Sequence, residues 1–124
     1  MGSEPEIYFY ADRHSATGYI YTYGLMESQK YASKMQDEMI AEIEHSQPEH
    51  VVYVSSPPSW LRQKTSGDRI FAWATQFLAA RYDCVELPGS TSLQIFRRRT
   101  SPGTPRAAGF SANEFVGAML LANK

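Results

Sequence analysis

Three residues with binding chemistry, Asp12, Arg13 and His14, follow the aromatic segment Tyr8-Phe9-Tyr10 after a single alanine. An arginine offers a planar fork of donors that suits an anionic or sugar-like ligand, and an aspartate accepts hydrogen bonds from hydroxyl groups. Open α/β sheets place ligand contacts at the ends of their strands. A solvated turn with an internal Asp12–Arg13 pair is the other interpretation, because charged loops are common at strand ends.

Aromatic residues could complete such a site. Tyr19 belongs to a tyrosine-rich run after the charged loop, and Trp60 follows two prolines. Their flat rings can stack on a ligand, and an indole also suits a membrane interface. The alternatives are ordinary core and edge packing for the tyrosines and a hydrophobic plug over the sheet end for Trp60. The predicted substrate-binding set is therefore Asp12, Arg13, His14, Tyr19 and Trp60.

The other reactive side chains form no catalytic pattern. His14, His45 and His50 lack the spacing of a metal site, and Ser55 lacks the glycine-flanked turn of a nucleophile elbow. Cys84 is the single cysteine, so the chain forms no internal disulfide, and its place in a predicted strand suggests a small buried residue. We predict no catalytic residue, no metal and no cofactor.

Length and charge narrow the class of protein. A chain of 124 residues fits one compact domain. Its 12 basic and 13 acidic side chains nearly balance, so nucleic acid is not an expected partner. Residues 1–5 lack the basic and apolar regions typical of a signal peptide, and the sequence given has no apolar run long enough to span a membrane, so we expect this fragment to be soluble. The run 97–99 is three arginines, which could touch lipid headgroups or blunt an edge strand.

The expected elements alternate between strand and helix. The apolar run 51–54 predicts a strand covered on both faces, as in a parallel sheet, and the helix before it stops at Pro48. In order, we expect a strand at 6–11, a strand or extended loop at 18–23, a helix from Ser28, a strand at 50–55, a helix after 66–68, a strand at 82–87, a turn at 88–90 and an antiparallel strand at 92–97. The predicted fold is α/β, a small sandwich with flanking helices and a mixed, mostly parallel sheet of about four to five strands.

The predicted domain organisation has three parts: an α/β domain at 4–98, a linker at 99–109 and a terminal amphipathic helix at 110–122. Ser111 and Glu114 have the spacing of a capping box, and Phe110 with Phe115 fits a hydrophobic staple. The apolar stripe of this helix needs a partner, and a homo-oligomer formed through it is one possibility.

Four segments carry a resemblance to a known family. They are Tyr8-Phe9-Tyr10-Ala11-Asp12-Arg13, then Thr17-Gly18-Tyr19-Ile20-Tyr21-Thr22, the acidic helix around 38–44 leading to Pro48-Glu49-His50-Val51-Val52-Tyr53-Val54, and Ser59-Trp60-Leu61. Over about residues 6 to 87, the chain resembles the globular tail of bacterial membrane glycosyltransferases, the dolichyl-phosphate-mannose protein mannosyltransferase-like proteins of glycosyltransferase family 39.

The resemblance implies a role without catalysis. In that family the catalytic acidic residues and the lipid-linked sugar donor belong to a transmembrane body, which has no counterpart here. We therefore expect a non-catalytic domain on the extracytoplasmic side, periplasmic or at the cell surface, that assists acceptor or glycan binding. The implied partners are the transmembrane portion of its own parent chain and a glycan or protein acceptor. The alternatives are a stand-alone small α/β enzyme and a protein-interaction module.

Overall fold

A four-stranded antiparallel sheet organises the molecule. The computed structural model describes residues 4–85, 87–90, 92–100 and 118–121, the last by backbone alone. The sheet order is β2-β3-β1-β4, and its strands are β1 (His50–Val54), β2 (Tyr82–Val85), β3 (Leu93–Arg98) and β4 (Ala118–Leu121). All three pairings between these strands are antiparallel. The α/β class is confirmed, and the expectation of a mixed, mostly parallel sheet is wrong.

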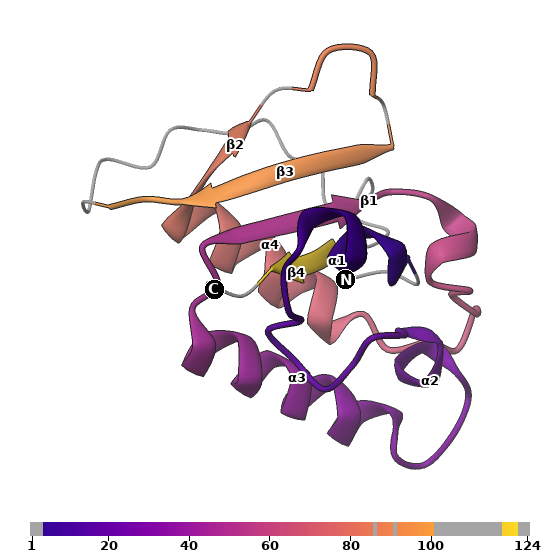
Figure 1. Ribbon diagram of the computed structural model, residues 1–124. Helices are drawn as coiled ribbons and strands as arrows, with labels where there is room; N and C mark the ends of the chain where they lie inside the picture. The colour runs from indigo at the N-terminus through magenta and orange to yellow at the C-terminus, as the bar shows by residue number, and fades with distance from the viewer. Residues whose placement is uncertain (1–3, 86, 91, 101–117, 122–124) are drawn as a thin grey trace.

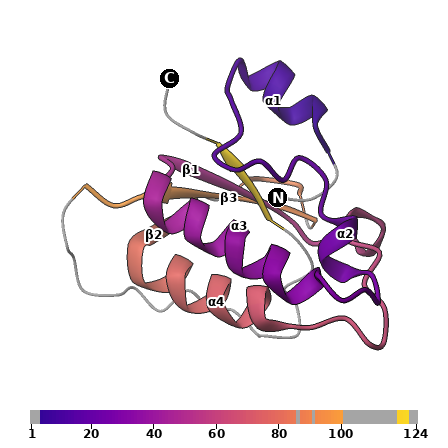
Figure 2. The same cartoon turned by 90° about the horizontal axis from the view of Figure 1, so that it is seen from below.

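Helices lie on both faces of this sheet. Helices α3 (Ala32–Ser46) and α4 (Arg69–Arg81) cover one face, and the short helix α1 (Glu6–Ala11) lies over the other, near β1 and β4 (Figures 1 and 2). Residues 51–54 of β1 are all buried, as predicted. Val51 and Tyr53 belong to the core on the α3–α4 side, whereas Val52 packs with Ile7 and Tyr8 of α1. The α3–α4 layer therefore covers one face of β1 and α1 covers the other, although the neighbouring strands are antiparallel.

The strand directions follow from the hairpin between β2 and β3. Both β1 and β2 run antiparallel to β3, so they run parallel to each other, with α4 in the connection between them. They are not neighbours, because β3 folds back from β2 through the predicted turn at 88–90 and lies between them. Gly89 has a φ of 83°, a backbone conformation that glycine adopts without steric cost.

The segment predicted as the first strand is instead helix α1. Pro5 has helical dihedral angles at its start, and Asp12 ends it in the left-handed conformation with a φ of 49°. Because β1 already pairs with β3 and β4, no strand position beside β1 is open to this segment. Its Ile7 and Tyr8 are partly buried against Val52 on the face of the sheet, so tertiary packing overrides aromatic strand preference here. The second predicted strand, 18–23, is a loop that leads into the short helix α2 (Tyr23–Met26).

The two long helices lie where the sequence predicted helices. Helix α3 begins at Ala32, four residues after the predicted cap Ser28, and ends at Ser46; Gln47 caps it with a φ of 42°, just before Pro48. Helix α4 buries the apolar residues of one face, whereas Arg81 at its C-terminal end is exposed. The buried residues of the two helices are Gln36, Met39, Ile43, Ile70, Phe71, Ala74, Phe77 and Leu78.

The C-terminal end differs from the prediction where it is described. Residues Ala118–Leu121 form β4, whose register with β1 pairs Met119 with Val52, whereas the sequence predicted a helix over 110–122. Without β4, the backbone N–H and C=O groups along one edge of β1 would have no strand to pair with. Residues 118–121 supply those hydrogen-bond partners by forming a strand. Residues 101–117, which include most of the predicted linker and the start of the predicted helix, lie outside the described residues.

Candidate functional site

The charged loop lies at the end of α1 rather than at the end of a strand. The backbone N–H groups of Asp12 and Arg13 donate to the carbonyl oxygens of Phe9 and Tyr8, which closes the helix. Arg13 Nη1 lies 3.6 Å from Glu49 Oε2, and Glu49 immediately precedes β1. Asp12 and His14 are exposed. The loop therefore presents two polar side chains to solvent and one that is engaged with the sheet.

Residues 4–13 form a strap across the sheet face. At one end the Ser59 hydroxyl donates to Glu4 Oε1, beside the segment that follows β1. At the other end Arg13 pairs with Glu49 where β1 begins. Between them, Ile7 packs over Val52. These polar contacts, together with apolar packing on Val52, hold this N-terminal strap over the sheet.

Tyr19 is committed to a structural contact. Its hydroxyl donates to Glu38 Oε2 on α3 at 2.7 Å, and the neighbouring Gly18 N–H donates to Glu42 Oε2 at 3.0 Å. Burial, with the nearby Glu38 carboxylate, raises the pKa of Tyr19 to about 12. The hydrogen bond from Tyr19 lowers the pKa of Glu38, with a smaller contribution from Lys34. These contacts fasten the loop before α2 to α3.

Trp60 lies in the core and presents no face to a ligand. Its side chain is 0% exposed, and its ring centroid lies 4.8 Å from that of Phe71 on α4. The neighbouring Ser59 accepts, through its backbone carbonyl oxygen, a hydrogen bond from the buried Thr22 hydroxyl at 3.1 Å. The interpretation of Trp60 as a hydrophobic plug therefore matches its position, and stacking on a ligand does not.

The five predicted site residues thus divide into two groups. Asp12, Arg13 and His14 remain together on one loop, whereas Tyr19 and Trp60 are built into contacts with α3 and α4. The structure also places Arg13 in an ion pair with Glu49. In the parts of the chain that the structure describes, no group of three or more His, Cys, Asp or Glu side chains could hold a metal ion.

Gln36 is a buried polar residue that the sequence pattern did not single out. Its side-chain amide donates to the carbonyl oxygens of Leu25 at 3.0 Å and Gly67 at 3.2 Å. Its side-chain oxygen accepts from the Ile70 N–H at 3.2 Å, at the start of α4. One side chain of α3 therefore joins α2, the loop before α4 and the first turn of α4. In the sequence, Gln36 could be suspected of being buried only because it lies one turn from Met39 on the same helix.

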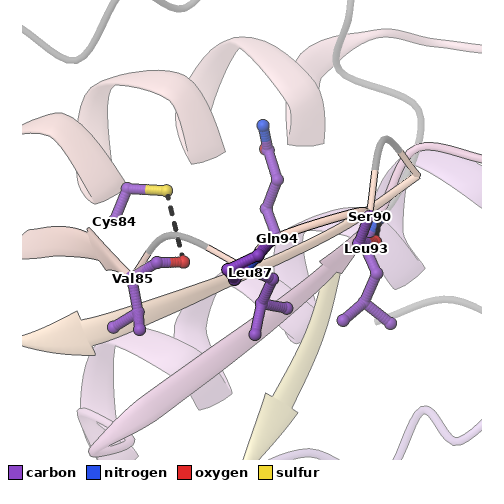
Figure 3. Close-up of a pocket in the computed structure, with 7 residues that line it drawn as sticks. Cys84, Val85, Leu87, Ser90, Leu93 and Gln94 are labelled. Carbon is purple, nitrogen blue, oxygen red and sulfur yellow. Dashed lines mark hydrogen bonds between the residues drawn. The ribbon is translucent and has the colours of Figure 1, made fainter.

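A cavity of about 440 Å³ lies at the end of the β2–β3 hairpin. Figure 3 shows Val85, Leu87 and Leu93 pointing to one side of the hairpin, while Cys84 and Gln94 point toward a helix on the other side. Cys84 is exposed, which corrects the prediction that it is buried. The cavity is largely aliphatic, with a few polar groups, and it resembles a contact surface more than a catalytic centre.

A third feature is a pair of exposed aromatic rings on α1. Phe9 and Tyr10 are each 82% exposed, and their ring centroids lie 5.6 Å apart in an edge-to-face arrangement. Ile7 and Tyr8 of the same helix pack against Val52 of the sheet, whereas the next two residues are exposed. Such exposure of large apolar side chains indicates a contact surface.

Comparisons with protein-family models, with curated proteins and with solved structures found no match for this chain. Among the described residues, no helix combines the length and the hydrophobicity needed to cross a bilayer. A proposal about function therefore depends on the geometry above together with the resemblance in sequence.

Proposed function

We propose that this chain is a non-catalytic, extracytoplasmic domain of a membrane glycosyltransferase-like protein, in which it assists acceptor or glycan binding. The observation that carries the proposal is that the residues responsible for the resemblance have structural roles in the folded domain. Tyr19, Trp60 and the apolar strand 51–54 are all packed or hydrogen-bonded into one scaffold. Because these residues support the scaffold, the resemblance describes a folded domain rather than a reacting centre, which is what the proposal requires.

The scaffold presents its polar loop and its exposed aromatic rings from the same strap. Asp12 and His14 are exposed immediately after α1, and Phe9 and Tyr10 are exposed on α1. Hydroxyl-rich ligands are bound by carboxylate and imidazole groups next to flat aromatic faces. The strap therefore supplies groups for a glycan or for a protein acceptor, without any requirement for Trp60.

The first test is the size and location of the endogenous protein. An antibody against this domain should detect a band much larger than the 124-residue chain, which stays with membranes after a salt wash. A soluble band of the size of this chain would overturn the proposal and favour a stand-alone protein.

The second test addresses the ligand. Glycans and prenyl-phosphate sugars are titrated into the domain and followed by NMR. We expect chemical-shift changes at residues 9–14, with a smaller response in a variant in which Asp12 and His14 are both replaced by Ala. Changes confined to other regions, or no changes, would remove glycan binding from the proposal.

A further inference from the structure

The outward face of α1 carries a carboxylate and two aromatic rings. Within this helix, which lies on the side of the sheet away from α3 and α4, Glu6 precedes Phe9 by three residues and Tyr10 by four (Figures 1 and 2). Side chains at these spacings are neighbours on a helix surface, with about 5–6 Å between their Cβ atoms. All three are exposed, whereas Ile7 and Tyr8 of the same helix pack on the sheet. We call Glu6, Phe9 and Tyr10 the α1 cluster.

The two rings of the α1 cluster meet at a corner. The centroids of Phe9 and Tyr10 lie 5.6 Å apart, and the ring planes are inclined to each other by 76°. Each side chain is 82% exposed, so ring surface remains open to a ligand. The face of an aromatic ring carries partial negative charge and attracts cations, and it also stacks on apolar groups.

Glu6 supplies the charge beside these rings. It is the one charged residue in the sequence of α1, and among the described residues it forms no hydrogen bond or ion pair. The other charged groups of the N-terminal strap are engaged: Glu4 accepts a hydrogen bond from a serine after β1, and Arg13 forms an ion pair with the glutamate before β1. Asp12 lies beyond the last residue of α1 and has interactions of its own. The α1 cluster itself therefore carries one negative charge.

A carboxylate next to aromatic faces is complementary to an organic ammonium group. The carboxylate accepts a charge-assisted hydrogen bond, and the rings add cation–π attraction. An amino sugar carries its amine directly on a small ring that also has an apolar face, so both kinds of contact can form within one turn of a helix. We propose that the α1 cluster binds a protonated amino sugar, with the amine at Glu6 and the sugar ring against Phe9 or Tyr10. This proposal rests on the proposed function, because it names the class of glycan that the strap binds.

The experiment is an NMR titration of the full chain with two matched ligands, a glucosamine trisaccharide and the same trisaccharide with every amine acetylated. Acetylation removes the charge and keeps the sugar rings. We expect chemical-shift changes at residues 6–10 and a Kd about tenfold lower for the charged ligand. Because the site is exposed, raising the salt concentration should weaken binding of the charged trisaccharide and leave binding of the acetylated one unchanged.

Variants separate the two contributions. Glu6→Gln should bring the two Kd values close together, because it removes the charge and keeps the size of the side chain. Phe9→Ser combined with Tyr10→Ser should weaken binding of both ligands by about fivefold. The matched control combines Glu27→Gln with Tyr31→Ser, an exposed acid and an exposed ring four residues apart. The ammonium group of Lys30 already lies 4.7 Å from the centroid of that ring, so the control should bind as the wild type does.

Several results would overturn the proposal. They are equal Kd values for the two trisaccharides in the wild-type chain, an unchanged preference in Glu6→Gln, and shifts confined to residues outside 6–10. A lysine-containing tripeptide supplies the same ammonium group on a flexible side chain. If it bound as tightly as the glucosamine trisaccharide, the α1 cluster would recognise a protein amine instead. The comparison of ligands on the wild-type chain does not depend on the folding of any variant.

The two proposals fail separately. Binding of neutral glycans at residues 9–14 without preference for the amine would leave the proposed function standing and remove the amino-sugar site. Binding of the glucosamine trisaccharide at the α1 cluster, together with a soluble endogenous protein of the size of this chain, would remove the proposed function and leave the amino-sugar site.

Discussion

The Tyr19 hydroxyl donates a hydrogen bond of 2.7 Å to Glu38 Oε2, so the loop after the N-terminal strap is fastened to the exposed side of α3. Lys34 lies 3.5 Å from the other oxygen of the same carboxylate. One acidic residue of α3 thus holds both a neighbouring turn of its own helix and a loop far from it in sequence.

This hydrogen bond should make stability depend on pH in a defined way. The folded pKa of Glu38 is lowered, so its contribution is present above the ordinary value of 4.5 and is lost as the pH falls through the folded pKa. The pKa of Tyr19 is raised from 10.0 to about 12, so its contribution is complete below pH 10 and is lost as the pH rises through about 12. We expect the difference in unfolding free energy between wild type and Tyr19→Phe to be largest between these limits.

Urea unfolding of both proteins across the pH range measures this difference. Burial also raises the pKa of Tyr82 to about 12, but Tyr82 is present in both proteins and its effect cancels in the difference. Tyr21→Phe, at an exposed tyrosine of the same loop, is the matched control. A difference that stays constant from acid to alkaline pH would contradict the prediction.

Trp60 should be a determinant of stability. Replacing it by Ala removes the largest fully buried side chain, and a loss of about 3–5 kcal/mol in unfolding free energy is expected from the cavity. Trp60→Phe should cost less, because the indole N–H is buried without a hydrogen-bond partner among the described residues. Leu61→Ala, at a side chain that is 56% exposed, should change stability by no more than about 0.5 kcal/mol. Equal effects at positions 60 and 61 in chemical denaturation would argue against this core.

Gln36→Leu should destabilise the protein although it keeps a similar volume. The substitution leaves the Ile70 N–H and the carbonyl oxygens of Leu25 and Gly67 without their partner in a buried place. A loss of about 2–4 kcal/mol is expected, since each buried unsatisfied group costs about 1–3 kcal/mol. Gln76→Leu, at an exposed position of α4, is the control and should be nearly neutral. Unfolding midpoints in urea would separate the two variants, and a neutral Gln36→Leu would show that these bonds are dispensable.

The N-terminal strap should open when the side chain that packs it on the sheet, Ile7, is truncated. A helix of six residues has little stability of its own, so α1 depends on the packing of Ile7 over the sheet. Ile7→Ala should increase hydrogen exchange at the N–H groups of Asp12 and Arg13 by about tenfold or more, while the amides of α4 stay protected. Phe9→Ala is the control, because its side chain is 82% exposed. If exchange in α1 and α4 rises together, the strap is not an independent unit.

The local pattern of the sequence was sufficient for the elements of the helical layer and for β1. Helix α4 could be predicted because Ile70, Ala74 and Phe77 recur on one helical face, and α3 because Pro48 marks its end. The apolar run 51–54 correctly indicated a strand covered on both faces, and the turn around Gly89 correctly joined two antiparallel strands. In each case residues close together in the sequence determine either the hydrophobic periodicity of the element or the point at which the element ends.

Tertiary structure alone decided the remaining features. The aromatic segment at Tyr8 has the composition of a strand, but β1 pairs on both sides, so the segment packs on the sheet face as a helix. Residues 118–121 have the composition of a helix, but they occupy the free edge of β1. The burial of Trp60 and the pairing of Arg13 with Glu49 depend on partners distant in the chain. A sequence indicates which side chains must be buried or solvated, but the positions still open on the sheet are known only after the other strands have paired.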